Sequence, residues 1–517
     1  MKMPQKMVLW VCAVVIFSSV HLAWANDIRV ENIRTDFHET FCDVDFDLSW
    51  SNSWRTGSGP VNWDAAWIFL KYRSVDQNGK GQGNWRHATL NTASRNHGVN
   101  NDGGVPAGFS PSEDGKGVFI YRGIEGRGPI RWQGVRLRWE TASDKFPLGS
   151  RAEIRIFALE MVYIPEGSFL AGDGVSPGRI HAGGDPKSPY RVTQAPPRMV
   201  NEPGGLWADG SPSKLPSGAS GPSPWDSPSG TLTAGFPTGY KAFYMMKYEI
   251  NQGFYAEYLN SLSRQQAQAR FVRSEQIADA RGCQPPCRFA IALGKDGIYS
   301  SAAPTRANIW MNWEDGVAFA DWAGLRPMTE LEFEKACRGS SQPAVPGEYA
   351  WGTTKIVSLT GFDGIDGSGT EKAVPPEANT SFQRIIQGPV RIGIFEGKPT
   401  RESSGASYYG IMDLSGNVVE MAVTIGNNAG RSFTGNHGDG ELTEQGSADV
   451  PSWPRGVPQS PQWAQVPNAG FGYRGGDFWN PELDLRVSAR NVATFAGARR
   501  LFGLGFRAVR TAPPGKP

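Results

Sequence analysis

The stretch RGGDFWNPELDLRVSARN, residues 474–491, decides the fold of the C-terminal part, because it joins a Gly-Gly turn to the strand-like segment LRVSARN. It contains no cysteine, and no cysteine occurs anywhere from residue 338 to residue 517. Its charged side chains permit a general acid-base site in principle, although charged residues in a loop are more often simply solvated. These side chains are Asp477, Glu482, Asp484 and Arg486.

Helices are predicted upstream of this stretch. In MTELEFEKACRG, residues 328–339, Thr329 and Glu332 form a T-x-x-E capping box, and Gly339 follows a basic last turn. NWEDGVAFADWAG (312–324) predicts a second helix. NQGFYAEYLNSL (251–262) places apolar side chains on one helical face behind Asn251 as N-cap. Short strands and turns fill the rest of the C-terminal half, so the pattern is α+β.

The N-terminal part has an all-β pattern. In CDVDFDLSW, residues 42–50, apolar and polar residues alternate strictly, which is typical of a half-buried strand. Similar strands recur up to residue 160, separated by Gly/Asn-rich turns. We therefore expect an antiparallel, immunoglobulin-like β-sandwich over residues 26–158. The aspartates of 42–50 could form a calcium ladder, although acids that alternate along a strand usually form its solvated face.

A second unit is predicted from residue 159 to residue 512. It begins with MVYIPEGSFLAGDG (161–174), a hairpin pattern of two strands around a Pro-Glu-Gly turn. Residues 172–237 are rich in Gly, Ser and Pro and cannot bury enough apolar surface to order themselves independently. We expect this insertion to be a long surface loop or a partly disordered segment.

Eight segments of this chain, taken in order, resemble the sulfatase-modifying-factor family, which contains the formylglycine-generating enzymes. The segments are MVYIPEG (161–167), FYMMKYEIN (243–251), NWED (312–315), LRPMTELEFEKACR (325–338), YAWG (349–352), YGIMDLSGNVVE (409–420), RGG (474–476) and GFRAVR (505–510). The resemblance implies a variant of the C-type lectin fold, mixed α/β with little regular structure and stabilised by bound calcium. The N-terminal sandwich lies outside it.

The resemblance implies one calcium site in the segment DLSGNVVE. Its ligands would be a side-chain oxygen of Asp413, the carbonyl oxygens of Gly416 and Val418, and the carboxylate of Glu420. The chemistry agrees, because calcium prefers several hard oxygens from a flexible loop. The alternative is that Asp413 caps a turn and Glu420 is solvated or ion-paired.

The resemblance also implies an oxidation that this chain is not equipped to perform. Formylglycine-generating enzymes oxidise a cysteine of a client sulfatase with oxygen and a copper ion held by two cysteine thiolates, and soft thiolates select Cu(I). Those cysteines fall here at or next to Asn480 and within 482–485, where there is no thiol. Asp477 replaces the family's active-site serine. A copper cofactor is therefore not expected.

Iron is not expected either. Related sulfoxide synthases hold iron with a histidine cluster, but the six histidines of this chain include no pair at helical spacing. Nucleic-acid binding is not expected. A net charge of +2 without a basic cluster supplies no positive electrostatic field that would attract phosphate backbones.

The first 25 residues predict a removable signal peptide. Basic residues precede the apolar segment LWVCAVVIF, and the A-x-A pattern of residues 23–25 follows it. No second apolar run is long enough to span a membrane. We expect a secreted protein, periplasmic or at the cell surface. In such an oxidising compartment Cys283 and Cys287 favour a short-loop disulfide over a metal pair, and Cys42 and Cys337 are expected to be buried free thiols.

Two classes of function follow. The first is a non-catalytic module that binds a peptide or a glycan, or a surface-structural module, with its ligand in a cleft. The cleft would be lined by Asp477, Phe478, Trp479, Asn480 and Arg490. The alternative for the two aromatic residues is core packing beneath the loop. The second class is an oxidoreductase that generates formylglycine on a sulfatase-like client or performs another oxidation.

Overall fold

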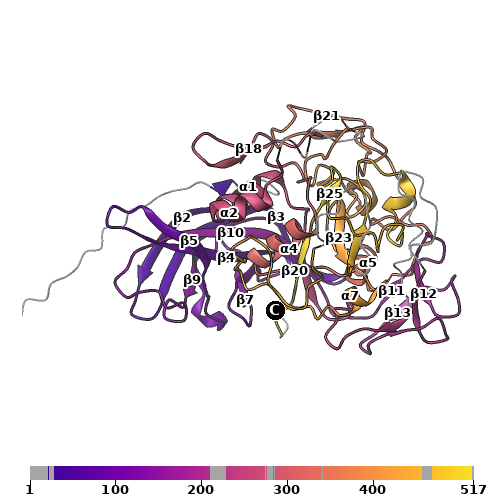
Figure 1. The fold of residues 1–517 in the computed structure, drawn as a ribbon, viewed down its shortest axis with the longest axis horizontal. Coiled ribbons are helices and arrows are strands. Elements are labelled where there is room, and N and C mark those ends of the chain that lie inside the picture. The colour runs from indigo at the N-terminus through magenta and orange to yellow at the C-terminus, as the bar shows by residue number, and fades with distance from the viewer. Residues whose placement is uncertain are drawn as a thin grey trace, which may run out of the picture.

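The structure, a computed structural model, describes residues 21–22, 28–209, 229–273, 275, 277, 283, 286–340, 342–456 and 469–514. The predicted signal peptide lies outside these residues except for β1 (His21–Leu22). Within the described residues the fold is mostly sheet with few helices, as the sequence predicts. In Figure 1 the N-terminal strands occupy one end of the molecule and the C-terminal elements the other.

The largest sheet has 13 strands, and its longest path runs β1-β2-β3-β4-β10-β17-β26-β20. The strands of this path after β1 are β2 (Arg29–Phe37), β3 (Cys42–Gly57), β4 (Val61–Val75), β10 (Ala152–Ile164), β17 (Phe243–Met246), β26 (Ala508–Thr511) and β20 (Arg326–Pro327). The branches are β5 (Gly81–His87), β6 (Gly98–Asn101), β7 (Ala107–Pro111), β8 (Val118–Arg122) and β9 (Gly126–Trp139).

The helices are short. They are η1 (Ser94–Asn96), α1 (Gln252–Asn260), α2 (Arg264–Arg270), α4 (Trp313–Trp322), α5 (Glu330–Arg338), α6 (Arg401–Ser404), α7 (Asn428–Arg431) and η2 (Glu482–Leu485). The predicted caps are confirmed: the side chain of Asn251 accepts from the Phe254 amide, and Thr329 with Glu332 forms a capping box. No helix in the described part of the chain is both long and apolar enough to cross a membrane.

Five small sheets complete the fold. They pair β11 (Phe169–Ala171) with β13 (Tyr190–Val192), β18 (Ile291–Leu293) with β19 (Tyr299–Ser301), and β21 (Gly361–Asp363) with β22 (Lys372–Val374). The other two join β12 (Ile180–Ala182), β15 (Leu206–Ala208), β14 (Arg198–Met199) and β16 (Gly230–Thr231), and β24 (Phe471–Arg474), β23 (Val419–Val423) and β25 (Leu504–Gly505).

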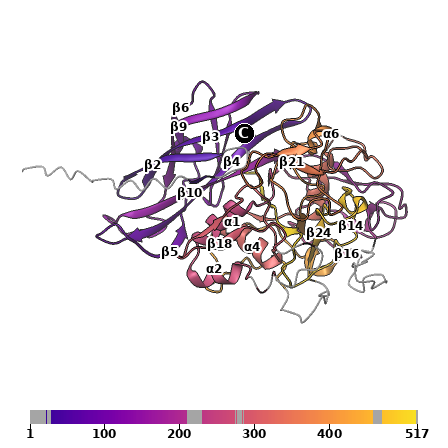
Figure 2. The same ribbon diagram turned by 90° about the horizontal axis from the view of Figure 1, so that it is seen from above.

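The two central strands, β4 and β10, are buried on both faces. Ile68 and Ile156 point into a core shared with β3 and β9, whereas Phe69 and Phe157 point into the larger core. On that second side the Trp322 ring of α4 lies 4.8 Å from the Phe157 ring, centroid to centroid. Figure 2 shows β3 and β9 on one side of β4 and β10, with α1, α2 and α4 on the other. Strands buried on both faces are continuously apolar, as WIFL in β4 is.

Strand β10 belongs to both predicted units. Its residues 152–162 pair with β4, and its residues 161–164 also pair with β17 of the C-terminal part. The division expected between residues 158 and 159 therefore falls inside one strand. The immunoglobulin-like sandwich expected for 26–158 is not confirmed, because its central sheet continues through β17 to β26 and β20 instead of closing on itself.

The polar face of β3 is ion-paired. Asp43 accepts two hydrogen bonds from Arg138 of β9 (2.9 and 3.0 Å), and Asp45 accepts from Arg136 at 3.1 and 3.3 Å. Two of the three aspartates that could have formed a calcium ladder are thus engaged by arginines of β9. The third, Asp47, accepts from the Asn32 side chain at 2.7 Å and from the Gly134 amide at 2.8 Å.

The segment 172–237 is more ordered than predicted wherever the structure describes it. Residues 172–209 and 229–237 contain five short strands, β12 to β16, and bury Ile180, Met199 and Leu206 completely. Apolar side chains spaced among the glycines were enough to attach the segment to the larger core. The part with the strongest Gly/Ser/Pro bias, 210–228, lies outside the described residues.

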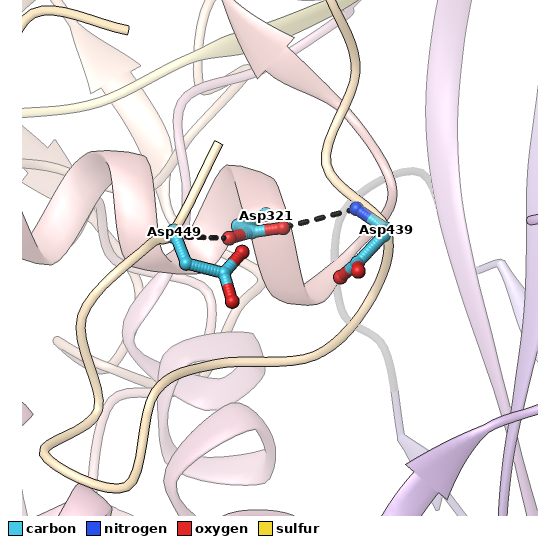
Figure 3. Close-up of side chains that lie close together, drawn as sticks. All are labelled: Asp321, Asp439 and Asp449. Carbon is cyan, nitrogen blue, oxygen red and sulfur yellow. Dashed lines mark hydrogen bonds between the residues drawn. The ribbon is translucent and has the colours of Figure 1, made fainter. Parts of the chain in front are cut away.

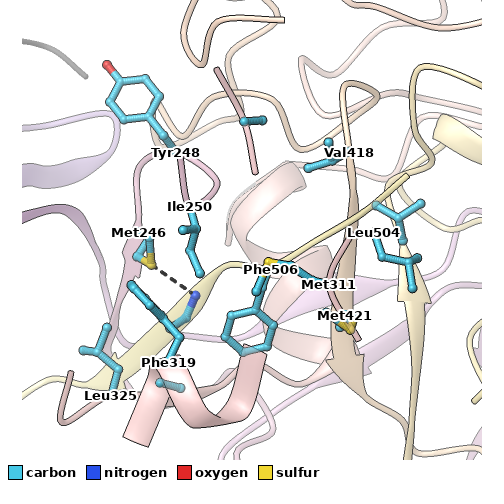
Figure 4. Close-up of a cluster of buried hydrophobic side chains, with 14 of the residues drawn as sticks. Met246, Tyr248, Ile250, Met311, Phe319, Leu325, Val418, Met421, Leu504 and Phe506 are labelled. Carbon is cyan, nitrogen blue, oxygen red and sulfur yellow. Dashed lines mark hydrogen bonds between the residues drawn. The ribbon is translucent and has the colours of Figure 1, made fainter. Parts of the chain in front are cut away.

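The larger core also fixes the C-terminal strands. Figure 4 shows Met246, Phe319 and Phe506 within one apolar cluster, and the Met246 sulfur accepts a hydrogen bond from the Ala508 amide at 3.3 Å.

Candidate functional site

The loop that follows β24 holds itself together by local hydrogen bonds. Gly475 and Gly476 both have positive φ (85° and 66°), which an L side chain rarely adopts, so the Gly-Gly turn is required by the backbone. The Asp477 Oδ1 atom then accepts from the amides of Trp479 and Asn480, each at 2.9 Å. The Asn480 side chain accepts in return from the Asp477 amide at 2.9 Å. Asp477 is a structural cap of this loop.

Burial changes the ionisation of this cap. Asp477 is 6% exposed, and desolvation raises the pKa of its carboxyl to about 7 despite the two amide donors. Its Oδ2 atom lies against Gly503, where an added Cβ would overlap it. The carboxyl therefore faces the protein interior.

Besides Asp477, two more of the five residues predicted to line a cleft are buried. Phe478 is completely buried and packs near Phe502, with ring centroids 6.0 Å apart. Arg490 is 1% exposed and donates to Glu330 on α5, with Nε 2.6 Å from Oε2. Core packing, the alternative considered for Phe478, applies. Arg490 is a structural cation, because a guanidinium enters the interior only with a carboxylate to balance it.

The remaining two, Trp479 and Asn480, are half-buried and lie beneath a second loop. The amide of Arg384 donates to the Phe478 carbonyl at 2.7 Å, and the amide of Gln383 donates to the Asn480 carbonyl at 3.1 Å. The Arg384 guanidinium stacks on the Trp479 ring, 3.2 Å from its centroid. Trp479 and Asn480 are thus the accessible part of the predicted cleft, with Arg384 beside them.

At the two positions where the resemblance would place copper-binding thiolates, the chain has no sulfur. The first would fall at or next to Asn480, and the second within residues 482–485, which form the 3-10 helix η2. The described free thiols lie elsewhere: Cys42 on β3 and Cys337 on α5 are both completely buried. Burial raises the pKa of both thiols, that of Cys42 to about 12, so neither supplies a thiolate. These residues do not fit a Cu(I) centre.

The other two cysteines that the structure describes are joined to each other. Cys283 and Cys287 form a disulfide, with Cα atoms 5.6 Å apart.

The predicted calcium segment forms a tight turn leading into β23. Asp413, Gly416 and Asn417 have positive φ (62°, 98° and 64°), so the backbone reverses twice within five residues. The Asp413 Oδ2 atom accepts from the Gly393 amide at 2.8 Å. Burial raises the pKa of this carboxyl to about 6.

Glu420 lies at the end of the segment and is fully buried. Its Oε1 atom accepts from Arg507 Nη2 at 2.9 Å, whereas Oε2 is buried and has no hydrogen-bond partner among the described residues. Burial raises the pKa of Glu420 to about 7, in spite of Arg507. An unpartnered carboxylate oxygen inside a protein indicates a missing proton or cation.

A third buried carboxylate, Glu249, was not predicted. Its oxygens accept from the Asn417 side chain (2.8 Å) and from the Val418 amide (3.2 Å). Burial, followed by the charges of Asp413 and Glu420, raises its pKa well above the usual range. The signal was available in FYMMKYEIN, where an acid stands three residues after the apolar strand β17 ends at Met246.

A network of buried ion pairs was also missed. Glu330 on α5 binds both Arg474 (2.8 Å) and Arg490, and Glu334 binds Arg474 (2.8 Å) and Arg338 (3.3 Å). Sequence alone could not pair these residues, because more than a hundred positions separate α5 from the two C-terminal arginines. The network attaches the 474–491 loop to α5 and is structural.

Three aspartates approach one another on another surface. Asp321 at the end of α4 accepts from the amides of Asp439 and Asp449, both at 3.1 Å, and the three carboxylates lie within 4.8 Å of one another (Figure 3). Burial and the two neighbouring charges raise the pKa of Asp321 to about 7.

The described fold is mostly sheet with a turn-rich C-terminal part, and the 474–491 loop in that part contains no cysteine. The profile of the sulfatase-modifying factor enzyme 1-like domain matches residues 185–512, more than half of the chain. The chain belongs to this family.

Individual relatives match only part of this chain. The formylglycine-generating enzyme of Bos taurus is 28% identical over 167 residues, which cover 26% of this chain and 44% of that enzyme. The formylglycine-generating enzyme of Thermomonospora curvata is 34% identical over 88 residues, 14% of this chain and 28% of that enzyme. The chain spans less than half the length of these curated relatives.

Proposed function

We propose that this chain is a non-oxidising member of its family that binds a peptide or a glycan, or serves as a surface-structural module. The observation that carries the proposal is the absence of sulfur from residues 474–491, the stretch in which the resemblance would place the copper ligands, at or next to Asn480 and within η2. Amide and carboxylate groups are hard ligands and do not hold Cu(I) as thiolates do. The thiols of Cys42 and Cys337 cannot replace them, because both are buried.

The accessible binding surface is Trp479 with Asn480 and Arg384. An indole flanked by a guanidinium and an amide offers an apolar face beside hydrogen-bond donors and an acceptor, which suits both peptides and sugars. The hydrogen bonds from the 383–384 loop hold this surface in place before any ligand arrives.

Calcium belongs to the same proposal. The donor set of Asp413, the carbonyls of Gly416 and Val418, and Glu420 consists of hard oxygens, and the unpartnered Oε2 atom of Glu420 fits a cation. Bound calcium would offset the buried negative charge of Asp413, Glu420 and the neighbouring Glu249. Its role would be to stabilise the turn that precedes β23. The C-type-lectin-like character of the domain is part of this proposal.

Export is a further part of the proposal. The leader-like pattern of residues 1–25 and the disulfide between Cys283 and Cys287 both suit a secreted or cell-surface protein.

The competing function is formylglycine generation, which the names of the relatives favour. Purified protein should be titrated with Cu(I) against a competing chelator and incubated with a cysteine-containing client peptide. A bona fide formylglycine-generating enzyme serves as positive control. We expect no tight copper binding and no aldehyde. Aldehyde formation together with tight Cu(I) binding would overturn the proposal.

The ligand itself is tested on glycan and peptide arrays. Binding of at least one array ligand should be lost in Trp479→Ala and kept in Trp207→Ala, a half-buried tryptophan on β15 that serves as the matched control. Equal loss in both variants would point to a general effect on folding. Persistent binding in Trp479→Ala would place the ligand elsewhere.

A further inference from the structure

A pocket of about 510 Å³ lies between the 232–243 segment, the start of α5 and the 434–437 loop. It shares no lining residue with the loop 474–491. Its walls are largely apolar, with Leu232, Phe236, Tyr240 and Phe243 among them. This volume is in the range of pockets that hold small molecules, on the order of several hundred Å³.

The charges around the pocket balance. Its lining contains two acids, Glu166 and Glu332, and two bases, Lys241 and Arg326. Arg326 and Glu332 neutralise each other at the floor through two hydrogen bonds of 2.9 and 2.6 Å. Glu166 and Lys241 are exposed at the rim. The pocket therefore supplies no net field that would select an anion or a cation.

His437 presents a defined hydrogen-bond donor to this pocket. Its Nε2 atom accepts from the Thr511 amide at 3.0 Å, so in the neutral ring the proton must be on Nδ1. Burial, together with Arg510 and Arg326, holds the pKa of His437 well below its usual range, and the ring stays neutral. Nδ1 makes no hydrogen bond to any part of the chain that the structure describes.

A second lining group also lacks a partner. The Oγ1 atom of Thr434 is buried and has no hydrogen bond within the described ranges. A buried hydroxyl without a partner is costly, because it gives up its hydrogen bonds to water. Because Thr434 lines the pocket, rotation of its side chain would bring Oγ1 to a ligand hydroxyl, and a second ligand hydroxyl could accept from His437 Nδ1.

We propose that this pocket is a binding site for a small neutral molecule rich in hydroxyl groups, a mono- or disaccharide. Aromatic walls give the apolar faces of a sugar ring a surface to pack on. His437 and Thr434 supply directed polar contacts, and the balanced charges leave neither an ammonium nor a carboxylate sugar favoured. This site is separate from the Trp479 surface of the proposed function.

The test uses the full chain and a panel of neutral sugars (glucose, galactose, N-acetylglucosamine, maltose and cellobiose), with glucosamine and glucuronate as the charged arm. Ligand-observed NMR should detect binding of at least one neutral sugar, and the charged analogues should bind more weakly. Binding of no neutral sugar, or of charged sugars alone, would overturn the proposal.

Two variants locate the site. His437→Phe removes the Nδ1 donor and should weaken binding about tenfold, the effect expected from one hydrogen bond. Because it also removes the acceptor of the Thr511 amide, Thr434→Val serves as the second variant. It removes an unpartnered hydroxyl at constant shape, so the melting temperature should hold or rise while binding weakens. Trp479→Ala should leave sugar binding in this pocket unchanged. Unchanged affinity in both pocket variants would refute the assignment.

Discussion

Glu330 and Arg490 form a fully buried ion pair across 160 residues of sequence, with Arg490 Nε 2.6 Å from Glu330 Oε2 and Nη2 3.0 Å from Oε1. The same carboxylate accepts from the Ile425 amide at 2.8 Å. Arg490, which the sequence predicted to line a ligand cleft, thus attaches the 474–491 loop to α5.

Arg490→Ala should therefore destabilise the fold strongly. It leaves Glu330 buried with one arginine fewer, and breaking such a pair costs about 3–5 kcal/mol. Urea denaturation measures the loss. Arg455→Ala, at an exposed arginine of the 442–456 segment, should change the unfolding free energy by less than about 0.5 kcal/mol. Equal effects in the two variants would contradict the structural role.

The loss of folding stability at acid pH should depend on Glu330. Its arginines hold the pKa at about 2, below the usual value for a glutamate. The unfolded chain therefore binds the proton first, and the contribution is complete above about pH 4.5 and is lost as pH falls toward 2. Glu330→Gln should flatten this limb in pH-dependent denaturation, and an unchanged slope would show that other groups dominate it.

Asp321 should act in the opposite direction. Its pKa is raised to about 7, so between about pH 4 and pH 7 the folded state keeps a proton that the unfolded state has lost. Stability should fall as pH rises through this window. Asp449→Asn removes a neighbouring charge and should reduce the fall, whereas Glu444→Gln on the same loop should not. If the two variants show the same dependence of stability on pH, repulsion between Asp449 and Asp321 does not contribute to the fall.

Chelation tests whether the protein binds calcium. If the site around Glu420 binds calcium, EGTA should lower the melting temperature, since a ligand at a hundredfold excess over Kd stabilises by about 2.7 kcal/mol. Glu420→Gln should abolish the response to EGTA. Glu160→Gln, another buried carboxylate, should keep it. A melt that does not respond to EGTA in the unmodified protein would refute the site.

Asp477 and Gly503 should be coupled. A methyl group at Gly503 would overlap Asp477 Oδ2, so Gly503→Ala should cost about 1–3 kcal/mol. In the Asp477→Ser background the shorter side chain can still cap the loop but leaves room, and the cost should largely disappear. A double-mutant cycle measures this coupling. Additive effects would mean that the strain lies elsewhere.

Local patterns in the sequence were enough to predict local structure. The alternation in 42–50 predicts β3, and the residues Thr329 and Glu332 predict the start of α5, because strand period and capping depend on neighbours in the chain. The order of eight short segments identified the family. The expectation that this chain binds no copper rests on the sequence alone, since residues 474–491 contain no thiol, and it stays a prediction.

Partnerships across the chain could not be predicted in this way. Arg490 looked like a cleft residue because nothing near it in sequence shows Glu330. Glu249 and Asp321 became strongly perturbed acids only when distant segments buried them. The strand alternation around 153–160 was visible, but its second partner, β17, lies some 80 residues further along the chain.

The sharing of β10 has a consequence for how the protein is made. As the chain leaves the ribosome, β4 and β10 can pair while β17 is still unsynthesised, so the nascent sheet carries an unpaired edge at residues 161–164. Open edges of this kind recruit other strands and promote aggregation. The edge at residues 161–164 therefore stays open until β17, some 80 residues further along the chain, is available to pair with it.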